Sequence, residues 1–384
     1  MRILLYFILL TGLYGCKNSE NSEHKQSVGF LANSEQRISY AKGFELHKTA
    51  DGITVITVIS PWPGADKKFT YALVPKEMMA NLEIDSSQFD AVIPVPVENL
   101  VVTSTTHIPA LEALEVADRL SGFPGTDYIS SEYTRERVSR GKVIDLGNNE
   151  MMNTEMTLRL DPELVVGFSI SSENKTYETL KRSGIPVVYN GDWTEQTPLG
   201  KAEWIKFFAP FFQMEAKAEI LFDSIAREYE QAAILAQNST SRPSVMSGAL
   251  YKDVWYAPGG NSWAAQFIQD ANAQYLWANS VETGSLSLSL ESVLEKANQA
   301  DFWVSPSQFT SYNELERANA HYLQFKPFQR KKVYTYASTK GDTGGLLFFE
   351  LGPNRPDLIL KDLIHIFHPE VLPEHTLFFF KPLQ

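Results

Sequence analysis

Cysteine is almost absent from this chain: Cys16 is the only one in 384 residues. A single thiol cannot form an internal disulfide, so the folded body has to be stabilised by its apolar core. The residues before Cys16 are apolar from Ile3 to Leu13, which is about the length of the apolar part of a signal peptide. This run is too short for a membrane-spanning helix, which needs roughly 20 apolar residues.

Other absences narrow the function. The seven histidines are mostly scattered, and the chain has no H-E-x-x-H motif, no Gly-Lys-Ser/Thr phosphate-binding loop and no G-x-G-x-x-G turn. The formal net charge of -12 disfavours nucleic acid or an anionic membrane surface as a partner. We therefore expect no catalytic cofactor, no metal cluster and no nucleic-acid binding.

The N-terminal segment has the features of an exported, anchored protein. Leu13-Tyr14-Gly15-Cys16 resembles the bacterial lipobox, in which the thiol is lipidated and becomes the mature N-terminus. Tyr14 departs from the small or β-branched residue that is usual there, and a buried strand with an incidental cysteine is the alternative. The polar run after Cys16 is typical of a flexible tether. We interpret 1–15 as a signal peptide and 16–37 as the tether.

The rest of the chain divides by its hydrophobic patterns. Alternating strand patterns and Asp-Gly and Pro-Gly turns predict a β-rich extension over 38–97. Strands then alternate with helices in two stretches, 98–196 and 242–384, which indicates βαβ units and parallel sheets. The composition, 43% hydrophobic and 21% charged, is typical of a globular protein with room for two ordinary domains.

A connecting segment over 197–238 separates the two α/β stretches. Thr197-Pro198 is typical of a helix start. Farther on, apolar residues step by three or four positions and predict one long amphipathic helix of about 23 residues. These positions are Met214, Ala218, Leu221, Ile225, Tyr229, Ala232 and Ala236. The predicted fold is α/β: two Rossmann-like lobes with parallel sheets, joined by a single long rigid helix, plus a small N-terminal β-rich module.

The two α/β stretches also resemble each other. Each has a capping residue followed two positions later by glutamate: Asn153 and Glu155 in the first, Ser289 and Glu291 in the second. In each, the next strand leads into a serine pair, Ser169-Ile170-Ser171 and Ser305-Pro306-Ser307. A duplicated lobe explains this pattern, and chance similarity between generic βαβ units is the alternative.

The order and spacing of several segments resemble the class III substrate-binding proteins of ABC importers, which bind iron-siderophores, haem and cobalamin. The segments are "NTEMTLRLDPELVV", "EAKAEILFDSIAREYEQAAILAQ", "LSLESVLEKANQADFWV" and "GPNRPDLILKDLIHIFHPE". The resemblance extends from about Asn99 to Pro382. It implies a monomeric, non-enzymatic protein in the periplasm, anchored by lipid to a bacterial membrane. Such a protein captures a metal chelate between its lobes and delivers it to an ABC permease dimer with its ATPase.

The resemblance gives Glu155 and Glu291 a docking role, in which one exposed carboxylate on each lobe pairs with arginines of the permease. Their position also has a purely structural explanation. A carboxylate in the first turn of a helix is favoured by the helix dipole, by roughly 0.3–1 kcal/mol. The two explanations are compatible.

The ligand is expected between the lobes, at the loops that leave the carboxyl ends of the parallel strands. The residues that we expect to contact it are Thr105, His107 and Tyr128 in the first lobe and Tyr251, Trp255, Trp263 and Asp342 in the second. Broad aromatic faces suit a large flat chelate. The alternative for each ring is the core beneath the loops, and the alternative for His107 as an axial metal ligand is a hydrogen bond at a helix start.

Three other functions are weighed against this one. A zinc- or manganese-binding protein of the related importer family would need several histidines and carboxylates in the cleft, and only His107 falls there. A hydrolase is disfavoured because no G-x-S-x-G motif occurs. A surface scavenger without a transporter would differ only in lacking the permease contact.

Overall fold

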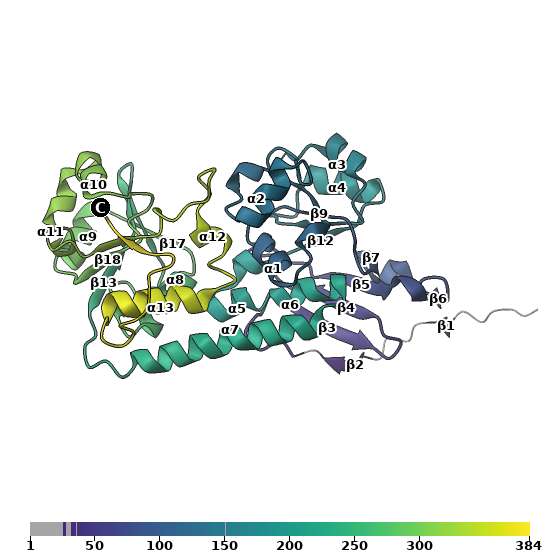
Figure 1. Ribbon diagram of the computed structural model, residues 1–384, viewed down its shortest axis with the longest axis horizontal. Helices are drawn as coiled ribbons and strands as arrows, with labels where there is room; N and C mark the ends of the chain where they lie inside the picture. The colour runs from purple at the N-terminus through teal and green to yellow at the C-terminus, as the bar shows by residue number, and fades with distance from the viewer. Residues whose placement is uncertain (1–25, 28–31, 36, 150) are drawn as a thin grey trace, which may run out of the picture.

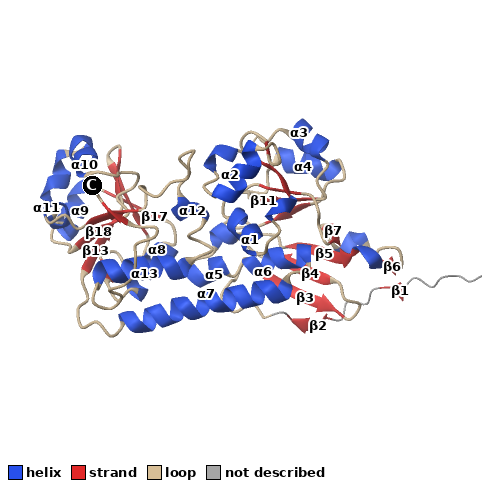
Figure 2. Ribbon diagram, in the orientation of Figure 1, coloured by secondary structure: helices blue, strands red, loops and turns tan. Residues whose placement is uncertain are grey.

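The protein consists of two lobes side by side, joined along one edge by a long helix (Figure 1). The computed structural model describes residues 26–27, 32–35, 37–149 and 151–384. Cys16 and the predicted signal peptide lie outside this range. Both lobes contain sheets flanked by helices (Figure 2), and the predicted two-lobed α/β fold is confirmed. Within the described residues, no helix combines the length and apolarity needed to cross a membrane.

The N-terminal module is a five-stranded sheet in the order β2-β3-β4-β5-β7. Its strands are β2 (Ala32–Glu35), β3 (Phe44–Thr49), β4 (Thr54–Val58), β5 (Phe69–Pro75) and β7 (Ala91–Val95). A two-residue strand, β1 (Gln26–Ser27), pairs with β6 (Leu82–Glu83). Because β2 pairs with β3, the prediction of a tether over 16–37 is wrong at its C-terminal end, where the backbone forms an edge strand.

The first lobe has a parallel sheet in the order β10-β9-β8-β11-β12. The strands are β8 (Leu100–Val102), β9 (Leu120–Phe123), β10 (Ile144–Asp145), β11 (Leu164–Gly167) and β12 (Val187–Tyr189). The helices are α1 (His107–Ala113), α2 (Glu132–Ser139), α3 (Thr154–Leu160) and α4 (Lys175–Arg182). The central strands are buried along their whole length, as their continuous apolar runs require when helices cover both faces.

The second lobe has a sheet in the order β16-β13-β18-β19-β20 and a separate antiparallel sheet, β14-β15-β17. The strands are β13 (Ser244–Ser247), β14 (Ala249–Tyr251), β15 (Val254–Pro258), β16 (Gln274–Tyr275), β17 (Ser285–Leu288), β18 (Phe302–Val304), β19 (Val333–Thr335) and β20 (Lys381–Pro382). The helices are α8 (Trp263–Asp270), α9 (Leu290–Ala297), α10 (Tyr312–Ala318), α11 (Lys326–Gln329), α12 (Leu347–Glu350) and α13 (Pro356–Phe367). The antiparallel sheet and the antiparallel edge strand β20 are additions to the predicted parallel sheet.

The connection between the lobes consists of α5 (Pro198–Ala202), α6 (Ile205–Phe208) and the 22-residue α7 (Glu215–Ala236). Helix α7 is about 33 Å long at 1.5 Å per residue. It passes beneath both lobes in Figure 1 and packs along α13, where Lys361 Nζ lies 2.6 Å from Glu228 Oε2. A single straight helix that contacts both lobes limits how far they can separate.

Two buried carboxylates attach the N-terminal module to the connecting helices and to the segment before α5. The Glu203 side chain is fully buried and accepts hydrogen bonds from the backbone N–H groups of Ser39, Tyr40 and Ala41 at 2.7–3.0 Å. Oε1 of Glu195 accepts from the backbone N–H groups of Lys42 and Gly43, both at 2.8 Å. Five consecutive residues of the module are therefore held by two acidic side chains.

Aromatic packing holds the other side of the module against the first lobe. The Tyr189 ring, at the end of the edge strand β12, contacts the rings of Trp62 and Phe69 at centroid distances of 5.2 and 4.7 Å. The Tyr71 hydroxyl accepts a hydrogen bond from the Tyr189 N–H at 3.0 Å. At Gly191 a Cβ atom would lie 2.3 Å from the Ser60 carbonyl oxygen, so only glycine allows this approach.

Replacing Glu203 with alanine is expected to destabilise the protein by about 3–5 kcal/mol, because three backbone N–H groups lose their acceptor. The buried Lys206 ammonium also loses one of its two carboxylate partners and keeps the other, Glu219, at 3.1 Å. Denaturant unfolding measures the change. Glu295→Ala, at an exposed position of α9, is the control and should shift stability by less than about 0.5 kcal/mol. Equal stability of the two variants would contradict the anchoring role of Glu203.

Candidate ligand-binding cavity

A cavity of about 500 Å³ lies in the second lobe, on the side where the parallel strands end. Its lining comes from the second lobe alone, from the ends of β13, β18 and β19 and from β14, β15, α8, α12 and α13. The volume lies within the range of small-molecule sites, roughly 300–1,000 Å³. We call it the aromatic cavity.

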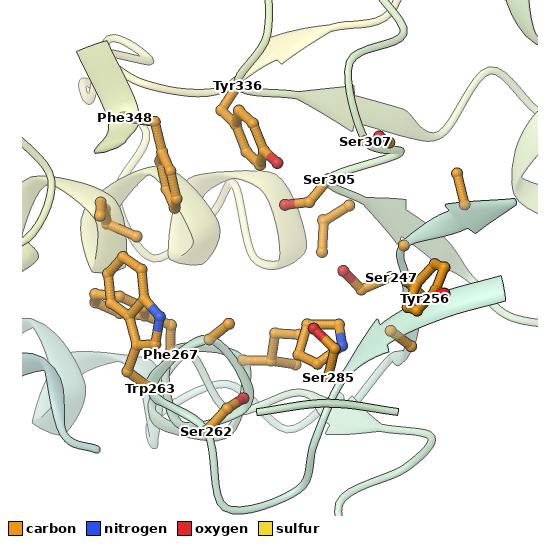
Figure 3. Close-up of a pocket in the computed structure, with 18 of the residues that line it drawn as sticks. Ser247, Tyr256, Ser262, Trp263, Phe267, Ser285, Ser305, Ser307, Tyr336 and Phe348 are labelled. Atoms are coloured by element: carbon orange, nitrogen blue, oxygen red, sulfur yellow. The ribbon is translucent and has the colours of Figure 1, made fainter. Parts of the chain in front are cut away.

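One side of the aromatic cavity is a stack of rings (Figure 3). Tyr336 stacks on Phe348 with the ring centroids 4.5 Å apart and the planes 13° from parallel. Trp263 continues the stack, 5.7 Å from Phe348, and Phe267 lies 5.5 Å from Trp263. Phe348 lies between Tyr336 and Trp263, so the three rings form one rigid apolar wall of the aromatic cavity.

The opposite side carries hydroxyl groups. Ser247, Ser285, Ser305 and Ser307 all line the aromatic cavity, and their hydroxyls form no hydrogen bond with the part of the chain that the structure describes. The lining contains no acidic, basic or histidine side chain. The aromatic cavity therefore offers stacking on one side and neutral hydrogen bonds on the other.

Local backbone geometry forms this serine side. Gly248 has φ +87°, and a Cβ atom there would lie 1.9 Å from the Tyr256 carbonyl oxygen, so the chain after β13 can pass close to β15 only with glycine. Ser305 and Ser307 both have φ of 54° although they are not glycine. Left-handed residues of this kind carry backbone strain, and such strain is frequent at ligand sites.

The two lobes touch beside the aromatic cavity through a contact that we call the interlobe latch. The buried carboxylate of Glu350, in α12, accepts hydrogen bonds from the Ser130 and Ser131 N–H groups of the first lobe at 2.6 and 2.8 Å. The Thr343 hydroxyl donates to the Asp127 carbonyl at 2.7 Å. The latch fixes the separation of the lobes at this point.

Two of the seven predicted ligand residues, Tyr251 and Trp263, line the aromatic cavity. Trp255 does not. Its ring is fully buried against Trp303 and Phe325, and its Nε1–H donates to the Ser247 carbonyl at 3.0 Å. The alternation of β15 points Trp255 into the core and its neighbour Tyr256 into the aromatic cavity, so Trp255 has no face left for a ligand.

The predicted first-lobe residues Thr105 and His107 are also absent from the lining. His107 is fully buried, and its ring packs against Phe208 with the centroids 5.3 Å apart. Burial lowers the pKa of His107 to about 4, so the imidazole stays neutral. A ring enclosed in this way cannot be an axial ligand to a chelate in the aromatic cavity. The alternative, a hydrogen bond at the helix start, is also not formed, because neither ring nitrogen has a hydrogen-bond partner among the described residues.

Tyr128 and Asp342 lie beside the latch rather than in the aromatic cavity. The Tyr128 carbonyl faces Gly345, where a Cβ atom would come within 2.3 Å, and the Tyr128 side chain is exposed. Asp342 is exposed on the same second-lobe loop. The structure thus brings these two predicted residues to one interlobe contact.

Most side chains that line the aromatic cavity are not among the predicted ligand residues. Ser305 and Ser307 belong to the repeated serine pair and directly follow the buried parallel strand β18. That position in the sequence is a signal for a ligand-binding loop. Tyr336 also directly follows a strand, β19. Phe348 lies in the four-residue helix α12, which has no recognisable sequence pattern.

Glu155 and Glu291 lie where the capping pattern predicts them. The Asn153 side chain accepts from the Met156 N–H and begins α3, and the Ser289 side chain accepts from the Ser292 N–H and begins α9. Both glutamates are exposed in the first helical turn, and Glu155 pairs with Arg159 at 2.8 Å.

No group of three or more histidine, cysteine, aspartate or glutamate side chains that could hold a metal ion is found in the described parts of the chain. The aromatic cavity also lacks the nitrogen and carboxylate donors that a zinc or manganese ion prefers.

Comparison with known proteins identifies the two-lobed body. The sequence signature described as "periplasmic binding protein" matches residues 100–339. An uncharacterized lipoprotein of Methanocaldococcus jannaschii is 27% identical over 299 residues, which are 75% of this chain and 69% of the relative. A second, uncharacterized protein of that organism is 23% identical over 286 residues, which are 72% of this chain and 83% of the relative.

Solved structures share the fold. A periplasmic haem-binding protein of Vibrio cholerae superposes with a TM-score of 0.56 at 16% identity, covering 71% of this chain and 100% of that one. A possible iron-binding protein of Staphylococcus epidermidis gives 0.54 at 17% identity, with 71% and 99% covered. A periplasmic vitamin B12-binding protein of Vibrio cholerae gives 0.50 at 12% identity, with 73% and 99% covered. The family match begins at residue 100, after the N-terminal module.

The interlobe latch predicts a pH dependence of stability. Burial raises the pKa of Glu350 from 4.5 to about 7, and the nearby Glu112 carboxylate adds to the rise. Between these values the folded protein holds a proton that the unfolded chain has released. The free energy of unfolding that the protonated Glu350 contributes is therefore fully present below about pH 4.5. It is expected to be lost as the pH rises to about 7.

Thermal unfolding between pH 4.5 and 8 measures this slope. Glu350→Gln stays neutral and should flatten it, whereas Glu132→Gln, at an exposed position of α2, should leave it unchanged. An unaltered slope in Glu350→Gln would show that Glu350 is ionised throughout this range.

Proposed function

This chain belongs to the periplasmic binding protein family, and from that membership we propose that it captures a metal chelate and delivers it to an ABC permease. The chelate is an iron-siderophore, haem or cobalamin. One of its faces rests in the aromatic cavity of the second lobe, and the loops of the first lobe cover the other. The protein changes no covalent bond; its role is to bind, retain and release.

The chemistry of the aromatic cavity supports this ligand class. A stack of three rings opposite four free serine hydroxyls suits a large ligand with a flat apolar face and polar edges. The absence of charged side chains from the lining makes it a poor site for a bare metal ion, which needs anionic or imidazole ligands. A chelate brings its own metal ligands and needs none from the protein.

Exposed apolar side chains near the strand ends of both lobes support capture between the lobes. They include Met151 and Ile170 in the first lobe and Tyr251 and Phe349 in the second. Met151 and Ile170 line a hollow of the first lobe, and Tyr251 and Phe349 line the aromatic cavity, so each lobe exposes apolar side chains that a ligand would cover. The named ligands of structurally similar proteins, haem and vitamin B12, have this size and character.

Lipidation at Cys16 would keep the protein beside its permease. Two of the sequence relatives are named as lipoproteins. An anchored binding protein on the periplasmic face of a membrane meets its permease at a high effective concentration, which compensates for a weak docking contact. In this proposal Glu155 and Glu291 provide that contact, one from each lobe.

Ligand binding tests the proposal directly. We expect one of four probes, haemin, ferric enterobactin, ferrioxamine B or cyanocobalamin, to quench tryptophan fluorescence with saturable, submicromolar affinity. Trp263→Ala should weaken that binding roughly 10- to 100-fold because it removes one ring of the stack. Tyr133→Ala, an exposed aromatic of α2, is the matched control and should bind normally. Failure of the wild-type protein to bind any of the four probes would refute the proposed ligand class.

Transport tests the docking role. The double variant Glu155→Arg, Glu291→Arg should bind the probe with unchanged affinity but abolish its uptake into cells, because arginine would face arginine on the permease. The control carries the same reversal at exposed Glu178 and Glu316 and should support normal uptake. Normal uptake with the first double variant would contradict docking through these glutamates.

A further inference from the structure

A second hollow of about 530 Å³ lies next to the aromatic cavity, and three parts of the chain line it. The N-terminal module provides Tyr40, Lys42 and the loop 60–65, and the segment before α5 provides 194–197. The second lobe provides a single residue, Thr283. We call this hollow the module cavity.

The two cavities meet at Thr283, which lines both of them. The two cavities are therefore neighbours that share this one residue as a wall. A large chelate with peripheral groups can fill both, with its flat body in one and an extension in the other.

The module's wall of this cavity is rigidly placed. The backbone N–H of Lys42 is held by the buried Glu195 carboxylate at 2.8 Å. The Ser60 carbonyl accepts a hydrogen bond from the Thr194 hydroxyl at 3.0 Å and lies against Gly191. These contacts fix the backbone from which the module's side chains extend toward the module cavity.

Free polar groups from all three parts face the module cavity. Three of these groups form no hydrogen bond or ion pair with any residue that the structure describes: the Lys42 ammonium, the Gln196 amide and the Thr283 hydroxyl. Glu195 also lines this cavity, but its Oε1 already accepts from Lys42 N, Gly43 N and Trp204 Nε1. The second Glu195 oxygen, Oε2, forms no hydrogen bond with the described residues. Lys42 is the one basic residue in the lining of the module cavity, and its ammonium has no partner among the described residues.

We propose that the N-terminal module is a third wall of the ligand site, in which Lys42 binds an anionic oxygen at the edge of the chelate. This inference rests on the proposed function, because it concerns the same ligand. It gives a role to the module, which lies before the part of the chain that matches the family. It also narrows the ligand to a chelate that carries carboxylate or catecholate oxygens.

The four probes named above separate these ligand classes. Haemin carries carboxylate oxygens and ferric enterobactin carries catecholate oxygens, and both are anionic at neutral pH. Cyanocobalamin has no carboxylate or catecholate and no net charge, because its phosphate balances the charge of the cobalt centre, and ferrioxamine B is cationic. We expect the best-bound probe to be anionic. Lys42→Glu should weaken its binding about tenfold, and Lys42→Gln by less, because reversal adds repulsion to the loss of a charge-assisted hydrogen bond.

Lys48→Glu is the matched control, since Lys48 is an exposed lysine of the same module and lies outside the cavity lining. It should leave the affinity unchanged, and thermal unfolding of all variants should coincide. Two results would overturn the inference while leaving the proposed function intact: equal binding by Lys42→Glu and wild type, or a clear preference of the wild type for an uncharged or cationic probe. Absence of binding to all four probes would instead refute the proposed function.

Discussion

Buried carboxylates that accept backbone N–H groups hold the separate parts of this protein together. Glu203 and Glu195 fix the N-terminal module, and Glu350 joins the second lobe to the first. In the same way Asp362 holds the backbone of 378–380, the segment that leads into β20. A buried carboxylate is costly without partners, and several N–H donors on one acceptor compensate for that cost only in one arrangement of the chain. Each of these groups therefore specifies a position as well as contributing to stability.

In the proposed function, each of these parts has a different role in binding the ligand. The second lobe alone forms the ring stack and the serine side, so the aromatic cavity exists whether or not the lobes move. The latch and helix α7 set how far the first lobe stands from it. The module adds a cation at the edge, where the second lobe has none. In the proposed function, the two-lobed body supplies the shape of the site and the added module supplies its selectivity.

Local patterns in the sequence predicted the fold well because they act over a few residues. Capping by Asn153 and Ser289 and the long helix were read correctly. The buried face of α7 includes Phe222 and Ala226, which were not predicted, whereas the predicted Leu221 and Ile225 are only partly buried. The predicted row of apolar residues is therefore rotated slightly about the helix axis from the face that is buried. The site was harder to predict. The neighbouring sheet decides whether Trp255 or Tyr256 faces the core. The backbone partners of Glu203 lie more than 160 residues away in the chain, and those of Glu350 lie more than 200 residues away.

The most direct measurement is a crystal structure of the protein with its best-bound probe. The account predicts that the chelate lies with one face on Trp263, Phe348 and Tyr336, and that an anionic edge group passes Thr283 toward Lys42. A chelate bound elsewhere on the molecule, with the ring stack open to solvent, would contradict it.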